Sequence, residues 1–118
     1  TCFFRKGLKD WYYKMRWFKD LYDRNVLLTD ERLEHFENDH PEMASQIDKV
    51  SETLSQPEIV VRSKTDSEAE LFYRHYLTTP IGEKYMCVVL KVKVDDVFIL
   101  TAYFTDAIKK GDVLWEKQ

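Results

Sequence analysis

Alternating apolar and polar residues fill the second half of the chain and predict a sheet. The alternation is clearest over residues 85–94 and 97–105, and the earlier segments 59–64 and 71–77 are rich in β-branched and aromatic residues. Runs of this kind, bounded by turn residues, are typical of β-strands. We therefore expect residues 59–105 to form a four-stranded antiparallel sheet.

The last two predicted strands indicate which side chains face the core. In segment 85–94 the apolar face holds Met86, Val88, Leu90 and Val92. In segment 97–105 it holds Phe98, Leu100, Ala102 and Phe104. A two-residue loop at Asp95-Asp96 would place these sets on opposite faces, because a shift of one residue inverts a strand. We expect a three-residue turn with a bulge instead, which leaves an open face with Thr101, Tyr103 and Thr105.

Apolar residues at helical spacing predict two helices before the sheet. Thr29 fits an N-cap, because acidic residues follow it in the first turn. Pro41 suits the first position of a second helix, which ends at Pro57. The core-facing stripe of this second helix consists of Met43, Ile47, Val50 and Leu54. The two helices are expected to join at His40-Pro41.

The two ends of the chain are less regular. Residues 8–15 carry a helical stripe, and residues 16–28 are either a β-hairpin, which we favour, or a continued helix. Residues 105–111 are expected to form a short helical turn that stops at Gly111, with residues 113–115 packing back onto the domain. The predicted class is α+β, with N-terminal helices, and a small hairpin among them, packed on the four-stranded antiparallel sheet.

Composition indicates one domain over residues 1–118, to which residues 1–16 either belong or are an extension. The chain is 44% hydrophobic, which argues against disorder. No apolar run approaches the roughly 20 residues that cross a bilayer. Cys2 and Cys87 have no partner at metal-ligand spacing, so we expect reduced packing residues, no cofactor and a cytoplasmic protein.

Charge is unevenly placed along a chain whose net charge is −3. Residues 5–24 are basic and residues 30–52 are acidic. The basic segment contains interleaved tryptophans and tyrosines, which fits contact with a nucleic-acid strand through phosphates and stacking. The alternative, which we favour, is a solvated helix face beside a packed aromatic one.

Few side chains are candidates for chemistry, since the sequence has three histidines and no Gly-rich phosphate loop. His35 lies off the apolar stripe of its helix, and it is either a catalytic acid or base or a structural residue. His40 is interpreted as a cap at the helix junction. Arg74 stands among aromatic residues and suits bidentate phosphate binding. Its alternative is a salt bridge with Glu68, Glu70 or an acidic helix residue.

Several short motifs resemble the phage-associated barnase–EndoU–colicin–RelE-like (BECR) nuclease domains. They occupy residues 26–36, 40–43, 72–74, 84–89, 100–106 and 108–111. The resemblance implies a metal-independent ribonuclease of toxin type, whose helices precede a four-stranded sheet that holds RNA. It implies a catalytic set of His35, Arg74, Thr101 and Tyr103. The implied phosphate or RNA contacts are Arg62, Tyr76, Thr105 and Lys109.

Two other functions stay open beside the ribonuclease. The first is a catalytically silent module that binds RNA or a protein on the same sheet face. The second is a domain whose open face is an oligomer interface. The expected partners are accordingly RNA, an antitoxin or immunity protein, or a second copy of the chain, and no membrane is expected.

Overall fold

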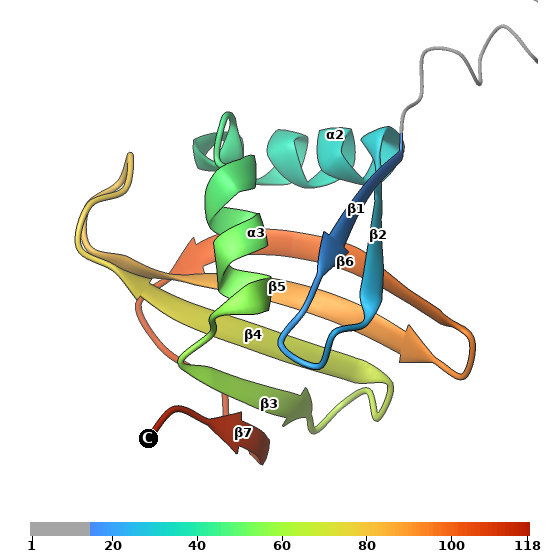
Figure 1. Cartoon of the computed structure of the whole chain (residues 1–118). Coiled ribbons are helices and arrows are strands. Elements are labelled where there is room, and N and C mark those ends of the chain that lie inside the picture. Colours follow the sequence, from blue (N-terminus) through green and yellow to red (C-terminus); the bar gives the residue numbers. More distant parts are fainter. Residues whose placement is uncertain (1–14) are drawn as a thin grey trace, which may run out of the picture.

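The computed structural model describes residues 15–118, which form one seven-stranded sheet with two α-helices (Figure 1). The strand order is β1-β2-β6-β5-β4-β3-β7. The first part of the chain contains β1 (Met15–Lys19), β2 (Asn25–Thr29), α2 (Asp30–Asp39), the 3-10 turn η1 (Pro41–Met43) and α3 (Ile47–Ser55). The second part contains β3 (Ile59–Ser63), β4 (Ala69–Tyr76), β5 (Lys84–Lys93), β6 (Asp96–Thr105) and β7 (Gly111–Glu116).

The predicted fold class is therefore wrong. The structure is mostly sheet, and the sheet is mixed, since β2 runs parallel to β6 through the pair Leu27↔Phe98. The strands predicted within residues 59–105 are present as β3 to β6 and pair antiparallel. The N-terminal hairpin adds two strands at one edge, and β7 adds one at the other. Local patterns missed this because edge pairing depends on where distant segments meet in space.

The hairpin favoured for residues 16–28 is confirmed by the antiparallel pairing of β1 with β2. Asp23 turns the chain with a φ of 64°, a backbone region that Asp tolerates better than most residues. The buried Asp20 carboxylate accepts the backbone N–H groups of Tyr22 and Arg24, each at 2.9 Å. Met15, which was assigned to a helical stripe, begins β1, and the rest of that stripe lies outside the described residues.

The first predicted helix is present as α2, whereas the second is divided into the 3-10 turn η1 and the shorter helix α3. The Thr29 hydroxyl accepts the Arg32 N–H at 3.1 Å, so the predicted N-cap is confirmed. After η1, Ser45 adopts a φ of 65°, which interrupts the helical geometry before α3 begins. The stripe still faces the core, with Met43, Val50 and Leu54 buried.

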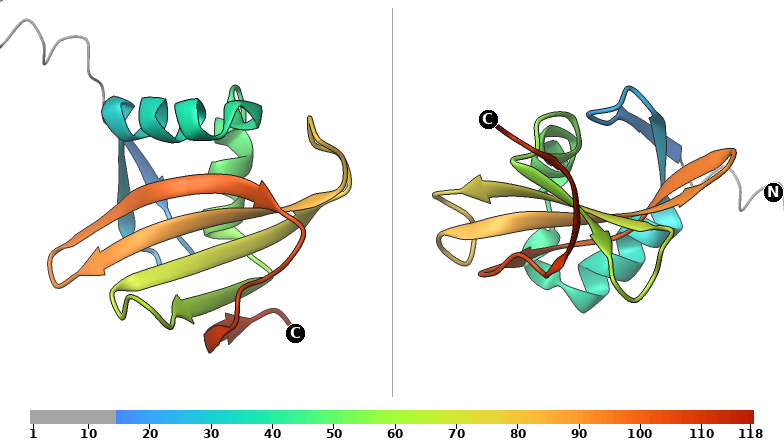
Figure 2. Two further views of the ribbon diagram at one scale, coloured as in Figure 1. Left: turned by 180° about the vertical axis from the view of Figure 1, so that it is seen from behind. Right: turned by 90° about the horizontal axis from the view of Figure 1, so that it is seen from below.

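One face of the sheet carries the main core, which α3 and the hairpin cover (Figure 1). The Leu21 N–H donates to the Leu54 carbonyl at 2.8 Å, so hairpin and α3 lie side by side over this face. The helix α2 runs along the outer edge of β6 instead (Figure 2). In the described part of the chain, neither α3 nor the hairpin covers the opposite face of the sheet, and we call it the open face.

A β-bulge in β6 corrects the predicted core. The predicted three-residue turn is wrong, because Lys93 pairs with Asp96 across a two-residue turn at residues 94 and 95. Leu90 pairs with Ile99, but Val89 pairs with Thr101. Leu100 is therefore an extra residue, and the strand changes face at this point. Ile99 is fully buried, whereas Phe98 and Leu100, both predicted for the core, are only partly covered. Ala102 and Phe104 are buried as predicted.

The C-terminal segment also differs from the prediction. No helical turn forms over residues 105–110, and Gly111 instead begins β7, which pairs antiparallel with β3. The predicted packing of residues 113–115 is realised through this pairing. A Cβ added at Gly111 would lie 2.2 Å from the Arg62 carbonyl oxygen. Glycine is therefore required by the close approach of two backbones.

We predict that Gly111→Ala lowers the free energy of unfolding by about 1–3 kcal/mol, because the added methyl group meets backbone atoms that cannot move aside cheaply. Urea denaturation followed by circular dichroism measures the effect. Asp112→Ala is the matched control at the neighbouring exposed position and is expected to change stability by less than about 0.5 kcal/mol. An unchanged midpoint for Gly111→Ala would contradict the close approach of β7 to β3.

Candidate functional site

Rows of paired residues cross the open face and build its surface. One row runs through Leu71, Val89 and Thr101, and the next runs through Tyr73, Cys87 and Tyr103. The register fixes these rows, since directly paired residues in a sheet point to the same face. Buried members of both rows form a second, smaller apolar cluster that Ile108 partly covers.

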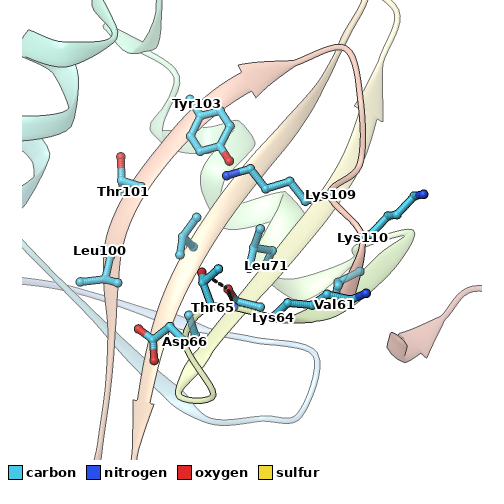
Figure 3. A pocket seen from close by; sticks show the side chains of 13 residues that line it. Val61, Lys64, Thr65, Asp66, Leu71, Leu100, Thr101, Tyr103, Lys109 and Lys110 are labelled. Atoms are coloured by element: carbon cyan, nitrogen blue, oxygen red, sulfur yellow. Dashed lines mark hydrogen bonds between the residues drawn. The ribbon is translucent and has the colours of Figure 1, made fainter. Parts of the chain in front are cut away.

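A cup of about 410 Å³ opens on this face. Its floor is apolar and includes Leu71 and Val89, while Thr101 and Tyr103 of β6 form one wall. Ser63 at the end of β3, residues 64–66 of the β3–β4 loop and the segment that follows β6 contribute the remaining walls. Figure 3 shows the Lys109 ammonium extending toward the Tyr103 hydroxyl. The volume lies within the range of small-molecule sites.

The rim of the cup is positively charged. Lys64, Lys109 and Lys110 line it, and they form no ion pair with the residues that the structure describes. Asp66 is the acidic residue of the lining, and its carboxylate is paired with the Lys91 ammonium at 2.7 Å. The cup therefore combines an apolar floor with free cations, which suits an anion that carries an apolar or aromatic part.

Beneath one end of the cup, Cys87 lies between Tyr73 and Tyr103. Burial raises the pKa of the Cys87 thiol to about 11, while hydrogen bonds with Tyr103 and Tyr73 act in the opposite direction. Burial also raises the pKa of both tyrosines. The Tyr73 hydroxyl accepts the backbone N–H of Lys109 at 3.0 Å, which fixes the segment after β6 over the face. Both phenols keep their protons at neutral pH.

His40 reaches the wall of the cup from outside. It caps α2, since its N–H donates to the Phe36 carbonyl at 2.8 Å, so the predicted capping role is confirmed. Its ring also lies on the Tyr103 ring, with 5.4 Å between centroids. The Glu42 carboxylate stands 3.8 Å from His40 Nδ1, and 37% of the His40 side chain is exposed. The His40 imidazole is thus held beside the cationic cup, with Tyr103 on one side and Glu42 near its Nδ1.

The residues predicted for the site divide between the two faces. Thr101, Tyr103 and Lys109 line the cup, and Thr105 lies further along the same face of β6. Arg62, Arg74 and Tyr76 belong to the face that carries the main core, because they alternate with the open-face residues of β3 and β4. The sheet separates these two groups, so they do not contact one ligand together.

Arg74 contacts the C-terminal end of α3 and does not face the cup. Its Nη1 donates to the Gln56 carbonyl at 2.7 Å, and its Nε stands 3.5 Å from the Glu52 carboxylate. The alternative of an ion pair with an acidic helix residue is the arrangement that forms. Tyr76 donates its hydroxyl to the same carboxylate at 2.6 Å, and burial raises the pKa of Tyr76 to about 12.

His35 lies on α2 away from the cup. Its Nδ1 stands 3.6 Å from the Asp39 carboxylate, and 54% of its side chain is exposed. It borders a shallow depression on the helix surface together with Glu31, Arg32, Glu34 and Asn38. The structure therefore does not bring His35, Arg74 and Thr101 to one point.

Sequence reasoning missed three members of the site, namely His40, Lys64 and Lys110. The helix junction explained His40 fully as a cap, and a lysine in a loop has no periodicity that reveals its direction. The Gly111 that follows Lys109-Lys110 is the one local signal, since it marks a close backbone approach that brings both lysines back to the sheet.

Within residues 15–118, no group of three or more His, Cys, Asp or Glu side chains is arranged to hold a metal ion. No helix in this part of the chain is long and apolar enough to cross a membrane. Comparison with protein-family models, curated proteins and solved structures finds no match.

The buried thiol predicts how stability depends on pH. The Cys87 thiol has a pKa of about 11 in the folded protein and a reference value of 9.0. Because the unfolded chain loses this proton first, the free energy of unfolding should fall as pH rises from 9.0 toward about 11. Below that pH range the thiol is protonated in both the folded and the unfolded chain, so it does not make the free energy of unfolding depend on pH.

Denaturant unfolding at pH 8 to 10 measures this slope, and Cys87→Ala is the control. In the variant, the free energy of unfolding should fall less steeply with pH, because the contribution of the thiol is gone. The contribution of Tyr73 and Tyr103, whose reference pKa is 10.0, should remain. Equal slopes in both proteins below pH 10 would show that the thiol is not buried as described.

Proposed function

We propose that this protein is a metal-independent ribonuclease that binds single-stranded RNA across the open face and cleaves it beside Tyr103. The observation that carries the proposal is the contact between the His40 and Tyr103 rings, whose centroids lie 5.4 Å apart with a tilt of 32°, next to a cup with a cationic rim. The resemblance of the sequence motifs to BECR nuclease domains supports the same activity. The proposal uses His40 where the resemblance implied His35.

The cup offers both kinds of contact that an RNA strand needs. Its lysines can neutralise phosphates, and its apolar floor with the Tyr103 ring can support a base. Proteins that bind single strands combine positive charge along the backbone with surfaces on which bases stack. The net charge of −3 does not oppose this, because much of the acidic charge lies on the helices and not at the cup.

Cleavage needs a base, a cation and a proton donor. The neutral imidazole of His40 would take the proton of the ribose 2′-hydroxyl, and the 2′ oxygen would then attack the adjacent phosphorus. Glu42, 3.8 Å from Nδ1, would stabilise the imidazolium that forms. The bond to the 5′ oxygen breaks, and the expected product is a 2′,3′-cyclic phosphate.

Lys109 and Tyr103 would act on the phosphate. The Lys109 ammonium would balance the charge that develops on the phosphate oxygens and give a proton to the leaving 5′ oxygen. Burial raises the pKa of Tyr103, so its hydroxyl stays protonated and can donate a hydrogen bond to a phosphate oxygen. Thr101, next along the same wall, would donate another.

The setting we propose is cytoplasmic, where RNA is accessible and the buried, free Cys87 stays reduced. A ribonuclease in this compartment requires control, so an antitoxin or immunity protein that covers the cationic cup is the partner we expect.

Incubation of the purified protein with single-stranded RNA in EDTA tests the activity. The wild type should release fragments that end in 2′,3′-cyclic phosphates. His40→Ala should slow cleavage by about 10²–10⁴-fold, the usual contribution of a positioned acid or base, while RNA binding persists. His35→Ala should cleave at nearly the wild-type rate. Loss of activity in His35→Ala but not in His40→Ala would overturn the assignment of the histidine.

Salt dependence tests the binding step separately. If Lys64, Lys109 and Lys110 each neutralise one phosphate, log K against log[salt] should have a slope of about −2, at roughly −0.7 per contact. Lys110→Met should make that slope shallower by about 0.7. Lys117→Met, which changes a lysine outside the cup lining, is the control. Salt-dependent binding without any cleavage by the wild type would leave a silent RNA-binding module as the function.

A further inference from the structure

We propose that Arg32 is a positioning residue that holds α2 against the bulge of β6 and thereby keeps His40 on Tyr103. This inference rests on the proposed function for its catalytic consequence. Its structural content, the dependence of the His40–Tyr103 contact on Arg32, can be tested whether or not the protein cleaves RNA.

Leu100 is the residue that has no partner in β5, because Val89 pairs with Thr101 and Leu90 with Ile99. On its other side β6 pairs with β2 only at Phe98. The Leu100 carbonyl instead accepts a hydrogen bond from Arg32 Nη2 at 2.6 Å. A charged donor makes this a strong bond, and it joins α2 to the point where β6 changes face.

From Arg32 to His40 the helix rises about 12 Å, at 1.5 Å per residue. From Leu100 to Tyr103 the strand advances about 10 Å, at roughly 3.3 Å per residue. The two lengths are similar, so Arg32 fixes one end of α2 on β6 and the ring contact lies at the other end. Phe36, between them in the helix, is buried in the main core.

Arg32 Nε is buried and has no hydrogen-bond partner among the described residues. A buried donor without a partner lowers stability. The backbone N–H of Arg32 is separately engaged by the N-cap hydroxyl of Thr29, so the helix start does not need the guanidinium. What the guanidinium adds is the link to Leu100.

Arg32→Met is the main test, because it keeps the aliphatic stem and removes the charge and every donor. Nuclear Overhauser effects between the His40 and Tyr103 ring protons report the contact directly. They should be lost or strongly weakened in the variant. In RNA cleavage, kcat should fall about ten-fold or more while KM changes less than about two-fold, because misplacing a catalytic group costs rate rather than binding.

Arg16→Met is the matched control. Arg16 forms an ion pair with Asp30, the first residue of α2, but does not touch the bulge. It should keep the ring contact and the wild-type kcat, even if its stability falls as much as that of Arg32→Met. Arg32→Lys, which restores one charged donor, should recover part of the contact.

The ring contact decides the inference. A folded Arg32→Met protein with an intact His40–Tyr103 contact overturns it. If Arg32→Met does not fold, Arg32→Gln replaces it with the same criterion, because the shorter amide does not reach Leu100. If the wild type never cleaves RNA, the ribonuclease proposal fails while the loss of the contact in Arg32→Met still supports the positioning role. A wild type that cleaves, with a kcat that Arg32→Met leaves unchanged, overturns the catalytic consequence.

Discussion

The bulge at Leu100 is the constraint on which the rest of the structure depends. Ile99 and Ala102 both bury their side chains in the main core, although strict alternation along a strand would place them on opposite faces. One extra residue between them lets both halves of β6 contribute to the core. It also turns Thr101 and Tyr103 to the open face and leaves the Leu100 carbonyl for Arg32. Core, cup and helix placement therefore share one origin.

The two faces of the sheet differ in how their charged side chains are paired. The covered face uses α3 and the hairpin to bury apolar rings and to neutralise charges, so that Arg24 meets Asp20 and Glu70, and Arg74 meets Glu52. The open face leaves three lysines around a cup without such partners in the described part of the chain. The cationic rim therefore distinguishes the open face from the covered one.

The candidate site was only partly predictable. Alternation placed Thr101 and Tyr103 on an open face, and the register supports that placement. The same alternation put Arg74 and Tyr73 on opposite faces of their strand. Because Tyr73 lies on the open face, Arg74 faces away from the cup. The resemblance nevertheless joined Arg74 with Thr101 in one catalytic set. The resemblance implied His35 as the catalytic histidine, and the helix junction identified His40 only as a cap. The choice depends on which end of α2 meets Tyr103, and that is set by packing.

The sequence by itself determined the strands β3 to β6, the N-cap at Thr29, the core-facing stripe of Met43, Val50 and Leu54, and the hairpin. Each of these follows from short-range periodicity or from a local hydrogen bond. Only the tertiary structure decided the seven-stranded order, the position of the bulge and the approach of His40 to the lysine-rimmed cup. These features join residues far apart in the chain, and the free energy that selects them comes from contacts that exist only once the chain has folded.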